Sequence, residues 1–297
     1  MMNSSEKKII FINKPNDFTV KKATRQDWEC VVQWGNKEGW NIGYHDADCM
    51  YSVDNDGLFI GWLGDQAVAA VSLINHSEQY AIWGNYLVNN EFRGKGYGKA
   101  VCKVAISHSG NRDIGSNAMP HMVSNYTRSG LKPIYNIVHY TGKLKKIASE
   151  NIKEISIVKP HHIDNIIKYD GLFFPTLRQK FLNSWLSFSG HTSYLKTVNG
   201  DIYGYGVIRP LPDGFRIGPL VARTPADAEE LFNTLTSGLL ENTKISIFLP
   251  EYVHESFFSF LRKRELFEQY HVVYMHNGNF KMNIPNDMYG IANLDLG

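Results

Sequence analysis

The segment "NNEFRGKGYGKAV", residues 89–101, joins a glycine-rich basic loop to a pattern typical of a helix. Three glycines and three basic side chains occupy the seven positions 93–99. Glycine lets the backbone curl around a ligand without side-chain clashes. The N–H groups at a helix start also attract anions, because they lack intrahelical partners and carry the positive end of the helix dipole. The segment therefore predicts a backbone site for an anionic group.

Composition limits the classes of protein that the chain can belong to. Its 297 residues include 31 Lys plus Arg and 29 Asp plus Glu, a formal charge of only +2. This balance argues against a nucleic-acid coat or a polybasic membrane binder. The three cysteines, Cys30, Cys49 and Cys102, form no CxxC or Cys/His cluster, so neither a disulfide framework nor a metal site is expected. Apolar runs are too short for a membrane span or, within residues 1–16, for a secretory signal, and we expect a cytoplasmic protein.

One order of elements is predicted twice along the chain. Each half contains a strand, two helices, three antiparallel strands, a helix, a strand, a helix and a closing strand. We interpret this repeat as an internal duplication, with domains at residues 1–148 and 149–297. The expected fold class is α/β (α+β), with two mixed, mostly antiparallel twisted sheets flanked by helices. Residues 280–297 are expected to form a tail that covers a sheet edge.

Two familiar phosphate-binding loops do not fit residues 93–99. A Walker loop needs GxxxxGK followed by a hydroxyl residue, but here Gly94 and the Gly98-Lys99 pair are too close together, and Ala100 follows. A Rossmann fingerprint needs GxGxxG within a parallel βαβ unit. The glycines here form GxGxG, and the strand before them belongs to a predicted antiparallel meander. Both alternatives fail on spacing and context.

The spacing that fits is Arg93-x-x-Gly96-x-Gly98. It resembles the pyrophosphate loop of the GNAT acetyltransferase superfamily, and so do the strand "NYLV" before it and "NYTRSGL" after it. The stretches "NKEGWNIGYHDAD" and "YDGLFFPTLRQKFLNSWL" resemble a narrower group, the YitH-like tandem acetyltransferases. In that group, a half that looks catalytic precedes a second GNAT-like half.

The resemblance implies acetyl-CoA as co-substrate, with no metal. The diphosphate would contact the backbone of seven residues: Arg93, Gly94, Lys95, Gly96, Tyr97, Gly98 and Lys99. The strand before the loop would splay from its neighbour and hold the thioester near Leu87 and Val88, where backbone N–H groups polarise its carbonyl.

The resemblance also implies that Tyr126 protonates the leaving thiolate, although a tyrosine that only packs its ring is the alternative. The base that deprotonates the acceptor is sought in the N-terminal helical segment. Glu38 and Asp46 are the main candidates, with His45 and Asp48 beside them. For each of these, a surface acid or a helix cap is the competing interpretation.

At the corresponding position the second half contains "VARTPADAEE". Glycines are absent, Pro225 removes an N–H group, and Asp227 and Glu229 would repel a diphosphate. Thr224 and Pro225 instead predict a capped helix start. We therefore expect a degenerate CoA loop in this half.

The leading hypothesis is an N-acetyltransferase in which an amine attacks acetyl-CoA directly in a ternary complex. The acceptor would be an amine-bearing small molecule, or a protein lysine or N-terminus, with no nucleic-acid or membrane partner. The alternative is a non-catalytic module that binds acyl-CoA or another protein. The sequence leaves the acceptor and the oligomeric state open.

Overall fold

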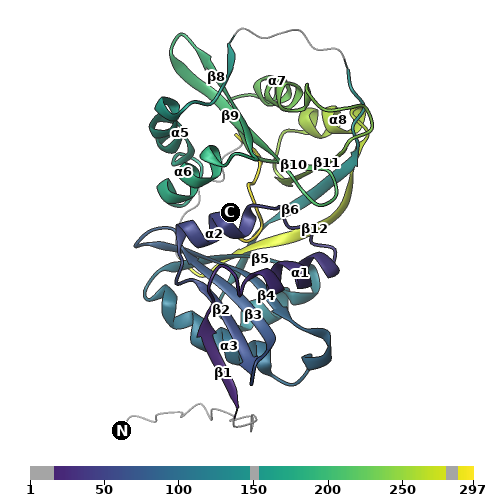
Figure 1. Ribbon diagram of the computed structural model, residues 1–297. Helices are drawn as coiled ribbons and strands as arrows, with labels where there is room; N and C mark the ends of the chain where they lie inside the picture. Colours follow the sequence, from purple (N-terminus) through teal and green to yellow (C-terminus); the bar gives the residue numbers. More distant parts are fainter. Residues whose placement is uncertain (1–16, 148–153, 279–286) are drawn as a thin grey trace, which may run out of the picture.

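The computed structural model describes residues 17–147, 154–278 and 287–297. Its elements confirm the predicted repeat (Figure 1). The first copy comprises β1 (Phe18–Lys22), α1 (Glu29–Lys37), α2 (Asp46–Val53), β2 (Leu58–Leu63), β3 (Gln66–Asn75), β4 (Tyr80–Val88), α3 (Tyr97–Ala105), β5 (Asp113–Ala118), α4 (Val123–Arg128) and β6 (Lys132–Lys143). The second comprises β7 (Ile155–Ile157), α5 (Ile163–Asp170), α6 (Gln179–Ser187), β8 (Thr192–Val198), β9 (Asp201–Pro210), β10 (Phe215–Ala222), α7 (Pro225–Thr236), β11 (Lys244–Pro250), α8 (Glu255–Lys263) and β12 (Leu266–His276); β13 (Met288–Gly290) follows.

Tight turns place the antiparallel strands as their sequences predict. Gly64 has φ +56° in the turn between β2 and β3. Asn199 and Gly200 have φ +52° and +88° between β8 and β9, and Val198 pairs with Asp201 across them. Positive φ at both central positions matches the right-handed twist of a hairpin, and Asn-Gly adopts it with little strain. Both turns therefore join the neighbouring antiparallel strands of each half.

The described strands form one sheet, in which each half receives the closing strand of the other. The order is β1-β2-β3-β4-β5-β12-β6-β11-β10-β9-β8-β7. β12 comes from the second half, yet it pairs with β5 of the first, and β6 of the first half pairs with β11 of the second. Figure 1 shows β6 and β12 crossing the middle of the molecule between the two halves. The predicted boundary between residues 148 and 149 lies outside the described residues, and the two-domain division stays a prediction.

A shared hydrophobic core also joins the halves. Trp28 and Val31 of the first half belong to the same buried cluster as Phe181 and Trp185 of α6 in the second half. All four side chains are at most 1% exposed. Burying an aliphatic or aromatic side chain of this size contributes about 1.5–3 kcal/mol. In the same region, α2 and α6 pack together between the two parts of the sheet (Figure 1).

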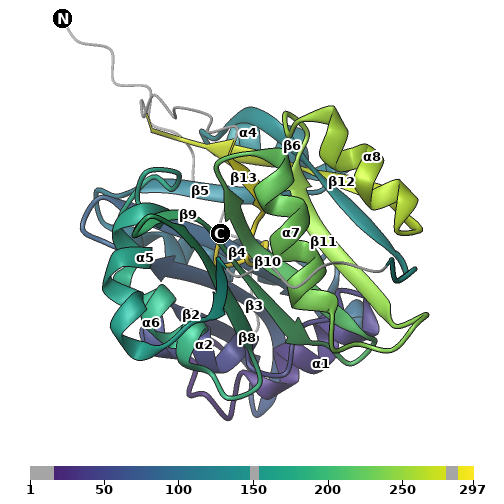
Figure 2. The ribbon, with the colours of Figure 1, turned by 90° about the horizontal axis from the view of Figure 1, so that it is seen from above.

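The C-terminal tail lies at the centre of the molecule rather than over a sheet edge as predicted. β13 pairs with β10 at Leu220 and Val221. The next residue, Ile291, donates its N–H to the carbonyl oxygen of Phe248 on β11 (2.9 Å). Figure 2 shows β13 beside β10, with the tail continuing from it toward the end of the chain near β4. Residues 291–297 thereby reach the part of the first half that was predicted to be functional.

Candidate active site

β4 and β5 are parallel neighbours that separate halfway along. They pair from Tyr80 to Trp83 on β4 and from Asp113 to Ser116 on β5, and in the described sheet this pairing goes no further. β4 continues to Val88, so its second half, residues 84–88, has β3 on one side and a gap on the other. The register between β3 and β4 shifts at this point, and Asn85 has φ +46°. The bulge turns the backbone at the place where the two strands diverge.

Backbone groups of β4 face this gap. The N–H of Asn89 donates to Val68 on β3 (3.0 Å), and N–H directions alternate along a strand. Leu87 therefore also points its N–H toward β3, whereas Val88 points its peptide groups into the gap. The carbonyl oxygen of Val88 accepts a hydrogen bond from Nε of Arg93 on that side (3.0 Å). Of the two residues predicted to lie beside a thioester, Val88 presents its N–H to the gap, and Leu87 is buried.

The loop at residues 93–99 lies directly against the open half of β4. Gly94 and Gly96 have φ +75° and +77°, and α3 starts at Tyr97. A Cβ on Gly98 would lie 2.5 Å from the hydroxyl oxygen of Tyr86 and 2.8 Å from Val88 Cγ2. A larger residue at position 98 would therefore push the helix start away from the strand. The N–H groups of the first helical turn lie at the mouth of the gap, as an anion site requires.

The basic side chains of the loop stay at the surface. Arg93, Lys95 and Lys99 are exposed. Nζ of Lys95 donates to the carbonyl oxygen of Glu91 (2.9 Å) and lies 5.2 Å from the centre of the Phe92 ring. The positive charges of Lys95 and Lys99 remain available to an anion that reaches the loop from solvent, whereas Arg93 is paired with Glu38.

Tyr126, on α4, lies on the other side of the gap. Burial raises the pKa of its hydroxyl above the usual value, and the nearby Cys102, Tyr86 and Asp295 raise it further, whereas an interaction with Ser116 lowers it. The hydroxyl consequently keeps its proton at neutral pH. The residue as a whole is half-buried, and its hydroxyl is the more deeply buried part. This combination suits a proton donor.

Asp295, from the C-terminal tail, is a carboxylate at the bulge that the sequence analysis missed. Its Oδ1 accepts the N–H of Asn85 (2.8 Å), and its own N–H donates to Oδ1 of Asn293 (2.7 Å). A Cβ on Gly84 would lie 2.6 Å from Oδ1 of Asp295, so the carboxylate lies directly on the backbone of β4. Burial raises the pKa of Asp295 to about 6, with a further contribution from the charge of Asp46. Its place in the tail, far along the sequence from the loop, gave no pattern by which to find it.

The two acids predicted as bases are both held in ion pairs. Oε1 of Glu38 accepts a hydrogen bond from Nη2 of Arg93 (2.8 Å), which places Glu38 at the loop. Asp46 is buried and accepts from Nε (2.8 Å) and Nη2 (3.1 Å) of Arg209. Burial alone would raise the pKa of Asp46, but the Arg209 guanidinium outweighs it, and the pKa is lowered. A carboxylate held in this way is a weak proton acceptor.

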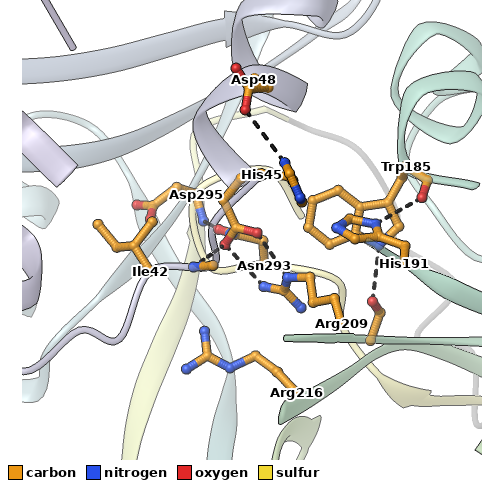
Figure 3. A network of polar contacts seen from close by, with 12 residues as sticks. Ile42, His45, Asp48, Trp185, His191, Arg209, Arg216, Asn293 and Asp295 are labelled. Atoms are coloured by element: carbon orange, nitrogen blue, oxygen red, sulfur yellow. Dashed lines mark hydrogen bonds and ion pairs between the residues drawn. The ribbon is translucent and has the colours of Figure 1, made fainter. Parts of the chain in front are cut away.

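Asp46 joins the two halves through Arg209 and Asn293, which Figure 3 shows side by side. Nδ2 of Asn293, in the tail, donates to Oδ2 of Asp46 (2.6 Å) beside the guanidinium of Arg209, which comes from β9. The ring of His45 stacks on Phe188 of the second half, with centroids 4.8 Å apart. These contacts fix the N-terminal helical segment and the tail relative to each other, and so fix the position of Asp295.

Comparison with known proteins identifies the fold and the chemistry. The family model described as "Acetyltransferase (GNAT) family" matches residues 21–126, and a second, described as "Acetyltransferase (GNAT) domain", matches residues 166–290. The chain belongs to the GNAT superfamily. It is 29% identical over 284 residues to the "Holothin acyltransferase" of Pseudoalteromonas sp. (strain SANK 73390), covering 94% of this chain and 95% of that protein.

Solved structures share the fold over nearly the whole chain. A putative acetyltransferase from Pyrococcus horikoshii has a TM-score of 0.78 at 18% identity, covering 96% of this chain and 97% of that one. A GCN5-related N-acetyltransferase from Sphaerobacter thermophilus has a TM-score of 0.60 at 13% identity, covering 95% and 99%. Together with the family models and the curated relative, the matches identify this GNAT protein as an acyltransferase. The prediction of an enzyme is confirmed, and the alternative of a non-catalytic module is set aside.

The second GNAT half has the corresponding gap, and its own chain fills it. β10 pairs with β11 only from Phe215 to Ile217 and then pairs with β13 instead. At the start of α7, the side chain of Thr224 accepts the N–H of Asp227 (3.1 Å), which confirms the predicted helix cap. Lys196 forms an ion pair with Asp227 (2.6 Å) where a diphosphate would otherwise need positive charge. A ligand would have to displace both the strand and the cap.

Within residues 17–147, 154–278 and 287–297, no group of three or more His, Cys, Asp or Glu side chains is arranged to hold a metal ion. Among the helices of the same ranges, none is both long enough and apolar enough to cross a membrane. The absence of a metal from the reaction stays a prediction.

Proposed function

We propose that this GNAT acyltransferase transfers an acetyl group from acetyl-CoA to an amine, using the gap of its first half. The observation that carries the proposal is that the loop at residues 93–99 lies at the mouth of the gap between β4 and β5. The diphosphate would bind the N–H groups of the loop and of the first turn of α3. The pantetheine arm would lie along residues 86–88 and accept a hydrogen bond from the N–H of Val88.

The proposed reaction needs one base and one acid. Asp295 accepts a proton from the acceptor amine, and the amine nitrogen attacks the thioester carbonyl carbon. The C–N bond forms, the C–S bond breaks, and Tyr126 donates its proton to the departing CoA sulfur. A backbone N–H of β4 polarises the carbonyl oxygen as charge develops on it. Glu38 and Asp46 then act through their ion pairs, by positioning Arg93 and the tail, rather than as the base.

Narrower parts of the sequence analysis also remain proposals: the YitH-like group, the acetyl group as the acyl donor and a cytoplasmic location. The acceptor classes stay as predicted, small-molecule amines or protein lysines and N-termini. Holothin belongs first in any acceptor panel because the relative from Pseudoalteromonas is named for it.

Gly96→Asp is expected to weaken CoA binding by at least about 30-fold, because it adds a negative charge at the anion site. Asp is among the non-glycine residues that best tolerate the φ of +77° found there, so the fold should persist. The measurement is calorimetric titration with CoA. Gly238→Asp is the control, because Gly238 is exposed and a Cβ there meets no atom within 4 Å. Equal CoA affinity in Gly96→Asp and wild type would refute the loop assignment.

Tyr126→Phe is expected to lower kcat by about 10²-fold while CoA affinity stays within about twofold, because only the proton donor is removed. Thiol release from acetyl-CoA, followed across a panel of amines, measures the loss. Tyr194→Phe, on β8 of the second half, is the matched control. Unchanged turnover in Tyr126→Phe would show that another group protonates the sulfur.

A further inference from the structure

Arg216 is a buried arginine of the second half whose charge interacts with those of Arg209, Asp46 and Asp295. It lies on β10 and is 6% exposed. Its Nε donates to the hydroxyl of Ser246 (3.1 Å), and its guanidinium carbon lies 4.8 Å from the centre of the Phe248 ring. In Figure 3 it lies beside Arg209, and no dashed line joins it to another residue drawn there.

Two other arginines buried at the centre have carboxylate partners, and Arg216 does not. Arg178 pairs with Asp170 and Arg209 pairs with Asp46, both at 2.8 Å. Among the described residues, the ion pairs within 4 Å include no partner for Arg216, and no described residue accepts a hydrogen bond from its terminal nitrogens. Burying a guanidinium without a counter-ion is costly. The cost is visible in its pKa, which burial and then the charge of Arg209 lower to about 10.

Asp46 forms no ion pair with Arg216, because its oxygens already accept from Arg209, Asn293 and the N–H of Gly43, and its charge raises the pKa of Arg216 only from a distance. Asp295 is close enough for its charge to act on Arg216, yet the two form no ion pair. Asp295 itself is bonded to the backbone of β4. Arg216 therefore lies near the proposed base without pairing with it.

The wall beside Arg216 is aromatic and uncharged. The ring of His139 lies between Phe248 and Tyr270, with centroids 4.6 and 4.8 Å away. Burial, and then the charge of Arg216, lower the pKa of His139 to about 3, so the ring is neutral. Neither ring nitrogen of His139 has a hydrogen-bond partner among the described residues. A polar ligand bound to Arg216 would therefore have aromatic, uncharged side chains beside it.

We propose that Arg216 binds a carboxylate of the acceptor, and that the acceptor is therefore an amine that also carries a carboxylate, such as an amino acid. A guanidinium with free terminal nitrogens matches a carboxylate through two parallel hydrogen bonds. The amine of the same molecule would then be directed to Asp295 and the thioester. This inference rests on the proposed function, and it adds a substrate class that the loop and the gap do not specify.

The test compares amino acids with the corresponding amino amides, which keep the amine and lose the charge. For wild type, kcat/KM with acetyl-CoA is expected to be at least about 30-fold higher for the acid than for its amide, the lower end of the effect of removing a buried charge partner. Arg216→Gln should reduce this preference to within about threefold, chiefly through KM, and leave the calorimetric CoA affinity unchanged. Arg223→Gln is the control, because that side chain is exposed and stacks on Tyr203.

The outcomes separate the two proposals. If the wild type does not bind CoA, the proposed function itself is wrong. If the wild type binds CoA and acetylates acids and amides at equal rates, only the carboxylate assignment is wrong. The same holds if it binds CoA and acetylates neither. A preference that persists in Arg216→Gln would assign recognition of the carboxylate to another residue. The comparison of acid and amide needs only the wild type, so it decides the question even where the variant fails to fold.

Discussion

Asp295→Asn lowers kcat by about 10²–10³-fold if the tail carboxylate is the base that accepts the amine proton. Asparagine keeps an oxygen that can accept the N–H of Asn85, so the tail should keep its place. The base acts only when ionised, and the pKa of Asp295 is about 6. In wild type, kcat/KM should therefore fall about tenfold per pH unit below pH 6 and lie on a plateau above it. The variant should lose this acid limb.

Measurement of kcat/KM from pH 5 to 9 with a fixed amine checks both expectations. Asp201→Asn is the matched control, because Asp201 is exposed at the β8–β9 turn. Calorimetric CoA affinity should be equal in all three proteins. A wild-type profile that stays flat down to pH 5, or an Asp295→Asn variant with full turnover, would exclude Asp295 as the base.

Arg209→Met is expected to lower the free energy of unfolding by about 3–5 kcal/mol, because it leaves the buried carboxylate of Asp46 without its cation. Urea unfolding at pH 8 measures the loss. In the variant, burial should raise the pKa of Asp46 instead of leaving it lowered. Protonation then relieves the penalty, so the difference from wild type should shrink as the pH falls.

Two further variants make this prediction specific. Asp46→Leu combined with Arg209→Met removes both charges and should recover much of the stability. Arg262→Met breaks an exposed ion pair with Glu255 and should leave the stability nearly unchanged. A loss below about 1 kcal/mol in Arg209→Met would mean that the pair does not hold the halves together.

Local chemistry explains which parts of the site could be predicted from the sequence. The glycines at 94 and 96 have positive φ, and Thr224 caps its helix, because these features depend on neighbouring residues alone. The ion pairs depend on distant residues: 55 positions separate Glu38 from Arg93, and 163 separate Asp46 from Arg209. The position of an acid in the helical segment therefore does not predict which residue forms an ion pair with it.

The pairing partners of β6 and β12 could not be predicted for a similar reason. β6 and β12 each have the alternation expected of a closing strand, and that pattern fits either half. Which partner each strand takes is decided by register and side-chain packing across the whole sheet. β13 enters the gap between β10 and β11, and the tail that follows it brings Asp295 to the gap between β4 and β5. This path also depends on long-range packing.

The exchange of β6 and β12 limits how the enzyme can open. A hinge between the halves, as in many two-domain enzymes, would have to extract β12 from its place between β5 and β6 and break both ladders at once. Reactants must then enter and leave while the two halves remain interlocked. This architecture permits small movements of surface loops but not a hinge opening of the two halves.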